Sequence, residues 1–365
     1  MRVLVVLGTS AGGVGQHVHG LVGSLTTGGH QVVVACPPAV EEHFGFAAVA
    51  ASYAPVELSD RPHPARDAVA VRDLRRLVAG ADVVHAHGLR AAALAVLAAG
   101  RSHTPVLATL HNAAPAGALT GAVYAALERV VALRAALVLG VSADLVERMT
   151  SLGARRVGLA VVAAPLPRSA GRDRYAVRAD LGIAGPTSLG VVVARLAPQK
   201  GLDTLLDAHA EIRDTDLVTV VAGEGPQRAA LQTRIDAESL PIRLLGRRDD
   251  IPDLLGAADV VISSALWEGQ PVGLQEALHA GAAIVATDVG GTAAVVGEAA
   301  LLVPAADPTS LSRAIRDVVL HGSVRDDLRS KAVERSGELP TPEDALEAAL
   351  TAYESVLDAR ARSGG

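Results

Sequence analysis

The feature that most constrains this chain is a set of short, continuous apolar runs separated by segments long enough to form helices. In the first half such runs lie at residues 2–7, 31–35, 82–85, 105–110 and 137–141. The segments between them are rich in Ala, Leu and Arg. Because a strand that is buried on both faces is apolar at nearly every position, this pattern predicts a parallel sheet covered by helices on both sides.

The same alternation begins again after a segment rich in Pro, Gly and small residues at 163–172, which is typical of a linker. The apolar runs of the second half lie at 188–194, 217–222, 242–245, 259–263, 283–286 and 300–303. With 365 residues, the chain is also too long for one ordinary core. We therefore predict two α/β domains with doubly wound sheets, at 1–165 and 170–340, and a helix at about 341–365 that packs on the first domain.

Composition narrows the classes of protein to which the chain can belong. No apolar run reaches the ~18 residues that a membrane-spanning helix needs, and Val3–Leu7 is too short for a signal peptide. The single cysteine, Cys36, excludes an internal disulfide and is typical of the reducing cytoplasm, which is the expected location. No group of Cys and His residues has zinc spacing, so no metal site is expected.

The net charge of −6 is distributed unevenly along the chain. Residues 1–165 contain 13 basic and 10 acidic side chains, so the negative charge lies in the second half. A weakly basic first half is compatible with an acidic acceptor or with peripheral contact at the inner face of the membrane, although so small an excess commonly has no function. No dense basic stripe is present and aromatic residues make up 2% of the chain, which disfavours nucleic acid as a partner. The oligomeric state is not predicted.

A glycine-rich loop, Gly12–Gly15, follows the first apolar run and precedes a helix-length segment. Glycines at such a turn let backbone amides approach an anion, but they also serve tight packing, and both explanations fit. A P-loop is excluded because Gln16 and His17 stand where it has Lys and Ser or Thr. The dinucleotide fingerprint is also incomplete, since Val18 replaces its third glycine and no acidic residue ends the second run. A dehydrogenase is therefore disfavoured.

Two cations follow the first apolar run of the second half. Arg195 and Lys200 stand between that run and the next helix-length segment, at the expected carboxyl edge of the sheet, and Lys200 is one of only two lysines in the chain. A guanidinium can hold one phosphate through two hydrogen bonds while an ammonium contacts the next, so the pair suits a diphosphate. A pair of solvated surface cations is the alternative.

Two glutamates follow the fourth apolar run of the second half, Glu268 in a turn and Glu276 inside the next expected helix. The first-turn amides of that helix, at Gly273 and Leu274, would be unpaired donors for a phosphate. The carboxylate of Glu276 can accept both hydroxyls of a ribose, and that of Glu268 can contact hydroxyls of a sugar. In the alternative reading, Glu276 interacts with the helix dipole and Glu268 is solvated.

Together with the glycine turns Gly223–Pro226 and Gly290–Gly291, these residues resemble the motifs of glycosyltransferase family 4, which has the GT-B fold of two Rossmann-like domains. The resemblance covers nearly the whole chain. It implies a retaining, metal-independent enzyme that transfers a sugar from a nucleotide-diphosphate sugar to an acceptor held between the two domains. No cofactor is expected. The base, the sugar and the acceptor, which can be a small molecule, a glycan or a lipid-linked group, are left open.

The resemblance also assigns roles to individual residues. It implies that Arg195 and Lys200 bind the donor diphosphate, that Glu276 binds the ribose and that Glu268 holds the sugar. It implies further that Gly13 approaches the diphosphate from the first domain.

Histidines are concentrated in the first half, with nine of the twelve before residue 165. His111, at the end of an apolar run, matches the histidine that lies near the reacting carbon in the family, so the resemblance gives it a catalytic role together with Glu268. The other candidate contacts to the acceptor or the sugar in this domain are Gly12, His17, His85, His87 and Asn112. Packing inside the protein is the alternative for each histidine.

The chain departs from the family pattern at two places. Val162–Pro165 stands where the family commonly has a Pro-Asn-Gly-like segment, and Ala294 stands where it commonly has a glutamate. Both departures leave the identity of the donor sugar open without removing the groups for the diphosphate and the ribose.

Two other functions are compatible with the same fold. One is a nucleotide-sugar epimerase or a phosphorylase, and the other is a non-catalytic protein that binds a nucleotide sugar. A binding protein would keep Arg195, Lys200 and Glu276 but would not need His111 or Glu268, so the presence of these two residues favours an enzyme.

Overall fold

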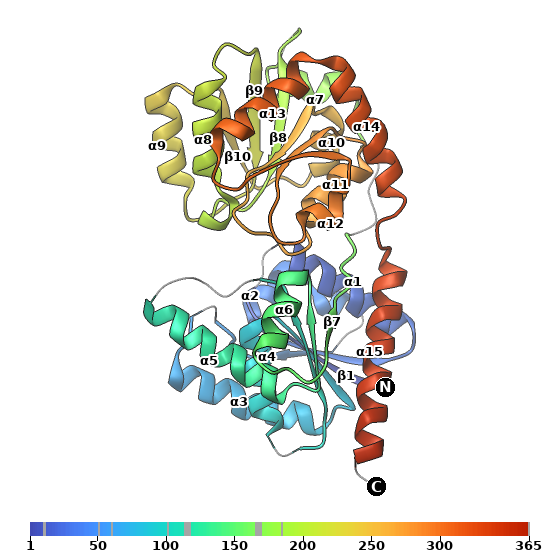
Figure 1. Ribbon diagram of the computed structural model, residues 1–365. Coiled ribbons are helices and arrows are strands. Elements are labelled where there is room, and N and C mark those ends of the chain that lie inside the picture. Colours follow the sequence, from blue (N-terminus) through green and yellow to red (C-terminus); the bar gives the residue numbers. More distant parts are fainter. Residues whose placement is uncertain are drawn as a thin grey trace. The chain divides into compact units, whose positions relative to one another are not determined.

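The computed structural model describes residues 1–9, 12–49, 52–59, 61–100, 102–112, 118–164, 170–183 and 185–363. The chain divides into two units, each with a sheet and a core of its own (Figure 1). The first unit is Met1–Pro165 together with Pro340–Gly365, and the second is Leu166–Leu339.

The first unit is built on a seven-stranded parallel sheet with the order β3-β2-β1-β4-β5-β6-β7. Its strands are β1 (Arg2–Leu7), β2 (Gln31–Cys36), β3 (Ser52–Pro55), β4 (Val83–His87), β5 (Val106–Leu110), β6 (Leu137–Gly140) and β7 (Val157–Leu159). The central strands β1, β4 and β5 are buried almost throughout, which explains their continuous apolar sequences. In register, Val5 lies beside His85 and Leu7 beside His87.

Helices cover this sheet on both faces. They are α1 (Gly13–Thr27), α2 (Pro38–Phe44), the 3-10 helix η1 (Phe46–Val49), α3 (Pro64–Ala79), α4 (Leu89–Ala99), α5 (Ala118–Arg134), α6 (Ala143–Ser151) and α15 (Pro342–Ser363). α3, α4, α5 and α6 pack in series, whereas α1 packs against η1 and α15. The C-terminal helix α15 lies beside α1 in Figure 1 and contributes Tyr353, which is completely buried, to the core of this unit.

The second unit has a six-stranded parallel sheet with the order β10-β9-β8-β11-β12-β13. Its strands are β8 (Ser188–Val193), β9 (Leu217–Ala222), β10 (Ile242–Gly246), β11 (Val260–Ser263), β12 (Ile284–Thr287) and β13 (Ala300–Val303). The helices are α7 (Arg174–Asp180), η2 (Pro198–Lys200), α8 (Leu202–Glu211), α9 (Arg228–Glu238), α10 (Ile251–Ala257), α11 (Val272–His279), α12 (Thr292–Val296), α13 (Pro308–Leu320) and α14 (Gly322–Ser336). One core lies under α8, α9 and α13, and another lies under α7, α10 and α11.

These two parallel sheets confirm the predicted fold class, and each apolar run named above contains a strand. The sequence pattern missed β3 and β7, which are the edge strands of the first sheet. Edge strands are less buried than central ones, so their sequences need not be continuously apolar. The pattern also missed the short helices α2, α7 and α12 and the longer helices α6 and α14. The predicted cap at Thr341 is present, because its hydroxyl accepts a hydrogen bond from the Asp344 amide at 3.1 Å.

Candidate active site

In the second unit, the strand order brings together two strands that are far apart in the sequence. β8 pairs with β9 on one side and with β11 on the other. The chain therefore leaves the carboxyl ends of β8 and β11 in opposite directions, and the crevice at such a switch point is where open α/β sheets bind ligands. Lys200 follows β8 and Glu268 follows β11, so two of the predicted donor-site residues lie at this point.

Lys200 and Glu268 form an ion pair at the switch point. The Lys200 ammonium contacts the Oε1 atom of Glu268, and the two side chains are only 25% and 11% exposed. Hydrogen bonds hold the two loops around this pair. The Leu266 amide donates to the Gln199 carbonyl at 2.8 Å. The Ser264 hydroxyl donates to the Lys200 carbonyl at 3.0 Å. The sequence located both charged residues but not their pairing, which depends on β8 and β11 being neighbours.

Arg195 and Glu276 also follow strands of this sheet but take no part in that ion pair. The side chain of Arg195 is exposed and makes no ion pair within the described part of the chain. Glu276 lies in α11 and is partly buried, and this burial raises the pKa of its carboxyl. Its carboxyl accepts no hydrogen bond from any residue that the structure describes. Both side chains can therefore take a ligand without breaking an existing contact.

The first turn of α11 differs in part from the prediction. The helix begins directly after Pro271, which provides no side-chain cap. The Leu274 amide donates to the Pro271 carbonyl at 3.0 Å, so the prediction that this amide is unpaired is wrong. The cause is a tight first turn with a hydrogen bond between residues three apart. The Gly273 amide donates no hydrogen bond among the described residues and is the first-turn amide that remains for a phosphate.

The glycine turns of the second unit are required by contacts between the loops themselves. Gly290 has a φ of +53°, and a Cβ there would lie 1.9 Å from the carbonyl oxygen of Glu268. Gly223 has a φ of +150°, and its Cβ would lie 1.9 Å from the carbonyl oxygen of Ala194. A larger residue at Gly290 would push its loop away from Glu268, and one at Gly223 would push its loop away from Ala194. Packing therefore explains these glycines without any contact to a nucleotide.

The glycine loop of the first unit contains glycines of two kinds. A Cβ at Gly15 would lie 2.1 Å from the ring of Phe44, so this position is small for steric reasons. Gly12 caps α1, which begins at Gly13, and a Cβ at Gly12 would meet no atom within 4 Å. Gly12 and Gly13 therefore remain candidates for backbone contact with an anion at the amino end of α1. The sequence could not separate the two kinds because Phe44 belongs to α2.

Four of the candidate histidines form one buried cluster in the first unit. They are His17 from α1, His85 and His87 from β4, and His111, which directly follows β5. The Nδ1 atom of His87 lies 3.0 Å from Nε2 of His111, and their rings are stacked with centroids 5.3 Å apart. The His17 ring lies 6.1 Å from that of His111. Each of the four is at most 8% exposed, so the parallel strands bring the predicted residues together, but as a packed group.

His85 is held from both sides of its ring. Its Nδ1 atom lies 2.8 Å from the hydroxyl of Tyr353, and its Nε2 atom lies 2.7 Å from the hydroxyl of Thr109. Because Tyr353 belongs to α15, the C-terminal helix is part of this network. No ring nitrogen of His85 is left for a substrate, which argues against its predicted role as an acceptor or sugar contact.

The histidine cluster is uncharged. Burial lowers the pKa of His17 to about 4 and that of His85 to about 3. Burial, with the neighbouring histidines as a smaller cause, holds the pKa values of His87 and His111 well below the usual range. The Nε2 atom of His87 is buried without a hydrogen-bond partner among the described residues. Since a buried unpaired N–H is the rarer case, we assign the His87 proton to Nδ1, which then donates to Nε2 of His111.

The remaining candidate positions are not part of this cluster. Asn112 is exposed beside His111. The two departures from the family pattern differ in burial. Val162, Ala163 and Ala164 are buried, whereas Ala294 is exposed in α12. Pro165 lies outside the described residues.

Among the described residues, no group of three or more His, Cys, Asp or Glu side chains has the arrangement of a metal site, the histidine cluster included. In the same part of the chain, none of the helices is both long and apolar enough to cross a bilayer.

Comparison with known proteins places these features in a family. A family model described as glycosyl transferase 4-like domain matches residues 12–165, and one described as glycosyl transferases group 1 matches residues 188–321. The chain is 30% identical to phosphatidyl-myo-inositol mannosyltransferase of Mycobacterium tuberculosis over 345 residues, which cover 88% of this chain and 86% of the relative. It is 26% identical over 247 residues to a putative teichuronic acid biosynthesis glycosyltransferase, TuaC, of Bacillus subtilis, covering 65% of this chain and 61% of that protein.

Solved structures share the fold at lower sequence identity. The crystal structure of Anabaena Alr3699/HepE in complex with UDP-glucose has a TM-score of 0.83 at 19% identity, covering 97% of this chain and all of that one. Sucrose-phosphate synthase from Thermosynechococcus elongatus has a TM-score of 0.84 at 18% identity, covering 98% of this chain and all of that one.

Two Rossmann-like units, each with a parallel sheet covered by helices, give the chain the GT-B fold that these solved structures share. Within that fold class, the chain belongs to the family 4 glycosyltransferases. The predicted resemblance is thereby confirmed.

Proposed function

We propose that this glycosyltransferase transfers a hexosyl group with retention of anomeric configuration and without a metal ion. The observation that carries the proposal is the Lys200–Glu268 ion pair at the switch point of the second sheet. It places a cation for a diphosphate next to a carboxylate for sugar hydroxyls, and Arg195 and Glu276 follow strands at the same edge.

Donor binding uses charges that are fixed before the reaction. Arg195 and Lys200 bind the diphosphate, the Gly273 amide adds a hydrogen bond, and Glu276 accepts the two ribose hydroxyls. Gly13 contributes a backbone contact to the diphosphate from the first unit. When the nucleoside diphosphate departs, negative charge grows on its oxygens. Cations and amides that are already oriented stabilise this charge without reorganising, so no metal ion is required.

The chemical step exchanges one bond at the anomeric carbon for another. The bond between that carbon and the phosphate oxygen breaks, and its electron pair goes to the leaving diphosphate. The acceptor hydroxyl forms the new bond from the same face and gives its proton to the phosphate oxygen that departs. His111 contacts the sugar near the reacting carbon. The products are a nucleoside diphosphate and a glycoside whose anomeric configuration equals that of the donor.

Glu268 is better suited to hold the sugar than to act as a nucleophile. Its Oε1 atom is engaged by the Lys200 ammonium, which stabilises the ionised carboxylate and lowers its tendency to form a bond to carbon. A diphosphate that binds Lys200 competes for the same ammonium. Donor binding therefore weakens the ion pair and frees Glu268 for hydrogen bonds with sugar hydroxyls.

The names of two relatives support a proposal for the acceptor class. One relative is a phosphatidyl-myo-inositol mannosyltransferase and another is named for teichuronic acid biosynthesis. We propose a lipid-linked or glycan acceptor for this chain, with peripheral contact to the inner face of the membrane while the lipid is bound.

A donor screen with analysis of the product tests the proposal. The protein is incubated with nucleotide sugars of different base and sugar, and release of the nucleoside diphosphate is measured with and without lipid-linked and glycan acceptors. The glycoside is then examined by proton NMR for the coupling at its anomeric carbon. Retention is expected. An inverted product, or an epimerised sugar nucleotide in place of a glycoside, would contradict the proposal.

A further inference from the structure

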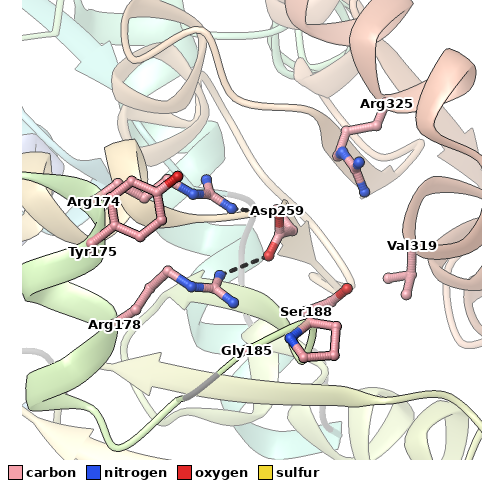
Figure 2. A pocket seen from close by; sticks show the side chains of 9 residues that line it. Arg174, Tyr175, Arg178, Gly185, Ser188, Asp259, Val319 and Arg325 are labelled. Atoms are coloured by element: carbon pink, nitrogen blue, oxygen red, sulfur yellow. Dashed lines mark hydrogen bonds and ion pairs between the residues drawn. The ribbon is translucent and has the colours of Figure 1, made fainter.

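A second polar site lies in the second unit, at the amino ends of the strands of its sheet. Ser188 is the first residue of β8, and Asp259 directly precedes β11. Together with side chains of α7 and α14, these residues line a cavity of about 400 Å³ (Figure 2). The cavity therefore opens at the amino ends of the two strands whose carboxyl ends carry Lys200 and Glu268. No step of the proposed reaction uses it.

Arginines from two helices gather at this cavity. Arg174 and Arg178 come from α7, and Arg325 comes from α14; in Figure 2 their guanidinium groups extend toward the space around Asp259. Arg329, one turn beyond Arg325, donates to the carbonyl of Ala258, the residue before Asp259, at 3.0 Å. Four guanidinium groups thus surround one buried carboxylate.

Only two of these four arginines donate hydrogen bonds to the Asp259 carboxylate. Asp259 accepts from Arg174 at 2.5 Å and from Arg178 at 2.8 Å. It also accepts from the Leu189 amide at 2.8 Å, which anchors it to β8. The Arg178–Asp259 pair is well shielded, since the two side chains are only 10% and 12% exposed. Arg325 donates to neither oxygen of Asp259.

The rest of the cluster carries uncompensated positive charge. Arg325 is partly buried and forms no ion pair or hydrogen bond among the described residues. Burial and the neighbouring Arg174 lower the pKa of Arg329, even though Asp259 and Asp326 act in the opposite direction. Partly buried like charges repel each other unless an anion is shared between them.

The rim of the cavity offers a contact for an organic group. Tyr175 is 78% exposed, and Figure 2 shows its ring at the side of the cavity formed by α7. The hydroxyl of Ser188 lines the cavity as well. A volume of about 400 Å³ exceeds what a bare phosphate ion needs and lies in the range of small-molecule pockets.

We propose that this cavity binds a small phosphate monoester, with the phosphate held by Arg325 together with Arg178 and the organic part against Tyr175. A dianion at this place neutralises the excess charge and links α14 to α7. Guanidinium groups suit it because they donate in parallel pairs to phosphate oxygens. The phosphate adds charged hydrogen bonds between the two helices, which stabilises the second unit.

Hydrogen exchange with inorganic phosphate as the probe tests this site apart from the donor site. Exchange is followed in peptides from α7 and α14 and, separately, in the loop 194–201 that carries Arg195 and Lys200. Phosphate is expected to give saturable protection of α7 and α14. In Arg325→Gln the apparent dissociation constant for this protection is expected to rise at least tenfold, since a charged hydrogen-bond pair is lost. Arg313→Gln, an exposed arginine of α13, removes the same charge and is expected to leave the constant unchanged.

The outcomes separate the sources of the phosphate and decide the proposal. The same titration is repeated with glycerol 1-phosphate and with vesicles that contain phosphatidic acid. Tighter protection by the soluble ester assigns the site to a free metabolite, and protection by vesicles alone assigns it to a lipid headgroup. Absence of saturable protection in the unmodified protein, or equal protection in Arg325→Gln, would overturn the site. Because Arg325 makes no hydrogen bond or ion pair among the described residues, misfolding of this variant is not expected, and circular dichroism checks it.

Discussion

At the carboxyl ends of β8 and β11 in the second unit, the candidate site contains an ion pair. Lys200 and Glu268 neutralise each other, and the guanidinium of Arg195 is solvated. At the carboxyl ends of β4 and β5 in the first unit, the polar side chains are neutral, because burial prevents the histidines from taking up a proton. Both sets occupy the edge at which a parallel sheet binds ligands. The side chains of the second unit are therefore suited to bind a charged group. The buried histidines of the first unit are suited to form hydrogen bonds away from water.

The two units therefore suit different parts of the substrates of a transferase. A diphosphate needs cations that remain charged at every working pH, which Arg and Lys provide. A sugar and its acceptor carry hydroxyl groups, for which neutral imidazoles can act as donor and acceptor. The predictions below test whether the two edges really differ in this way, beginning with the largest expected effect.

Acid should destabilise the first unit through its histidines. His17 and His85 have folded-state pKa values of about 4 and about 3, below the usual value of 6.5. Their neutral forms are favoured in the folded state, so their stabilising contribution is complete above pH 6.5 and is lost as the pH falls toward these values. Relative to pH 7, each of these two histidines should lower the free energy of unfolding by roughly 2 kcal/mol at pH 5. Amide exchange of β4 and β5, corrected for its intrinsic pH dependence, measures this loss.

A variant that cannot take up a proton at one of these positions sharpens the test. His17→Gln should reduce the pH dependence in β4 and β5 by about a quarter, because it removes one of the four buried histidines whose pKa is lowered. His103→Gln, at an exposed position of the same unit, should leave it unchanged. Equal pH dependence in all three proteins would mean that the histidine cluster does not control the acid stability of this unit.

The same two sets of side chains show which features of the site could be predicted from the sequence. Lys200 and Glu268 could be located because each directly follows an apolar run, and strand ends in parallel sheets meet at one edge. The histidines could be located by the same rule, but their burial could not. It depends on Tyr353, which lies 268 residues after His85 in the chain. Contacts of that kind leave no periodic signal in a sequence.

Packing partners were also hidden in the glycine motifs. For the glycine loop the sequence left two explanations open, an approach to a ligand and tight packing, and it could not decide between them for any single glycine. The structure separates Gly12, which faces open space, from Gly15, which faces the Phe44 ring, and from Gly290, which touches the carbonyl of Glu268. The distinction depends on which loop folds over which, and only the three-dimensional structure provides it.

At the charged edge, Lys200→Ala should weaken donor binding more than Arg195→Ala does. Both remove a contact to the diphosphate, worth about 1.5–3 kcal/mol for a charged hydrogen bond. Lys200→Ala also leaves the buried carboxylate of Glu268 without its partner and near the diphosphate, so its loss should fall at the upper end. Calorimetry with the nucleoside diphosphate measures both values. Lys331→Ala, which removes the other lysine from the surface, is the control. Unchanged affinity in both Arg195→Ala and Lys200→Ala would contradict the proposal that these two residues bind the donor diphosphate.

At the neutral edge, His111→Ala should lower turnover at least about tenfold while donor affinity stays near that of the unmodified protein, since the lost contact acts in the transition state. Tyr353→Phe is the matched comparison, because it removes a hydrogen bond from the same histidine cluster on the side of His85. Its turnover should change little. If both variants lose turnover equally, His111 serves the packing of the cluster, and the catalytic contacts lie in the second unit.

The smallest expected effect is that of a chelator, which should leave turnover unchanged. The comparison of the two edges gives the reason. At the charged edge, Arg195 and Lys200 already supply positive charge to the diphosphate, and a divalent cation would have to compete with them for the same oxygens. At the neutral edge, burial holds the imidazoles without charge, but no group of three metal-ligating side chains among the described residues has the arrangement of a metal site. Turnover is measured after dialysis against EDTA and again after addition of manganese or magnesium. Activity that disappears on dialysis and returns with either ion would show that the charge at Arg195 and Lys200 is insufficient, and the metal would then have to be held largely by the donor diphosphate itself.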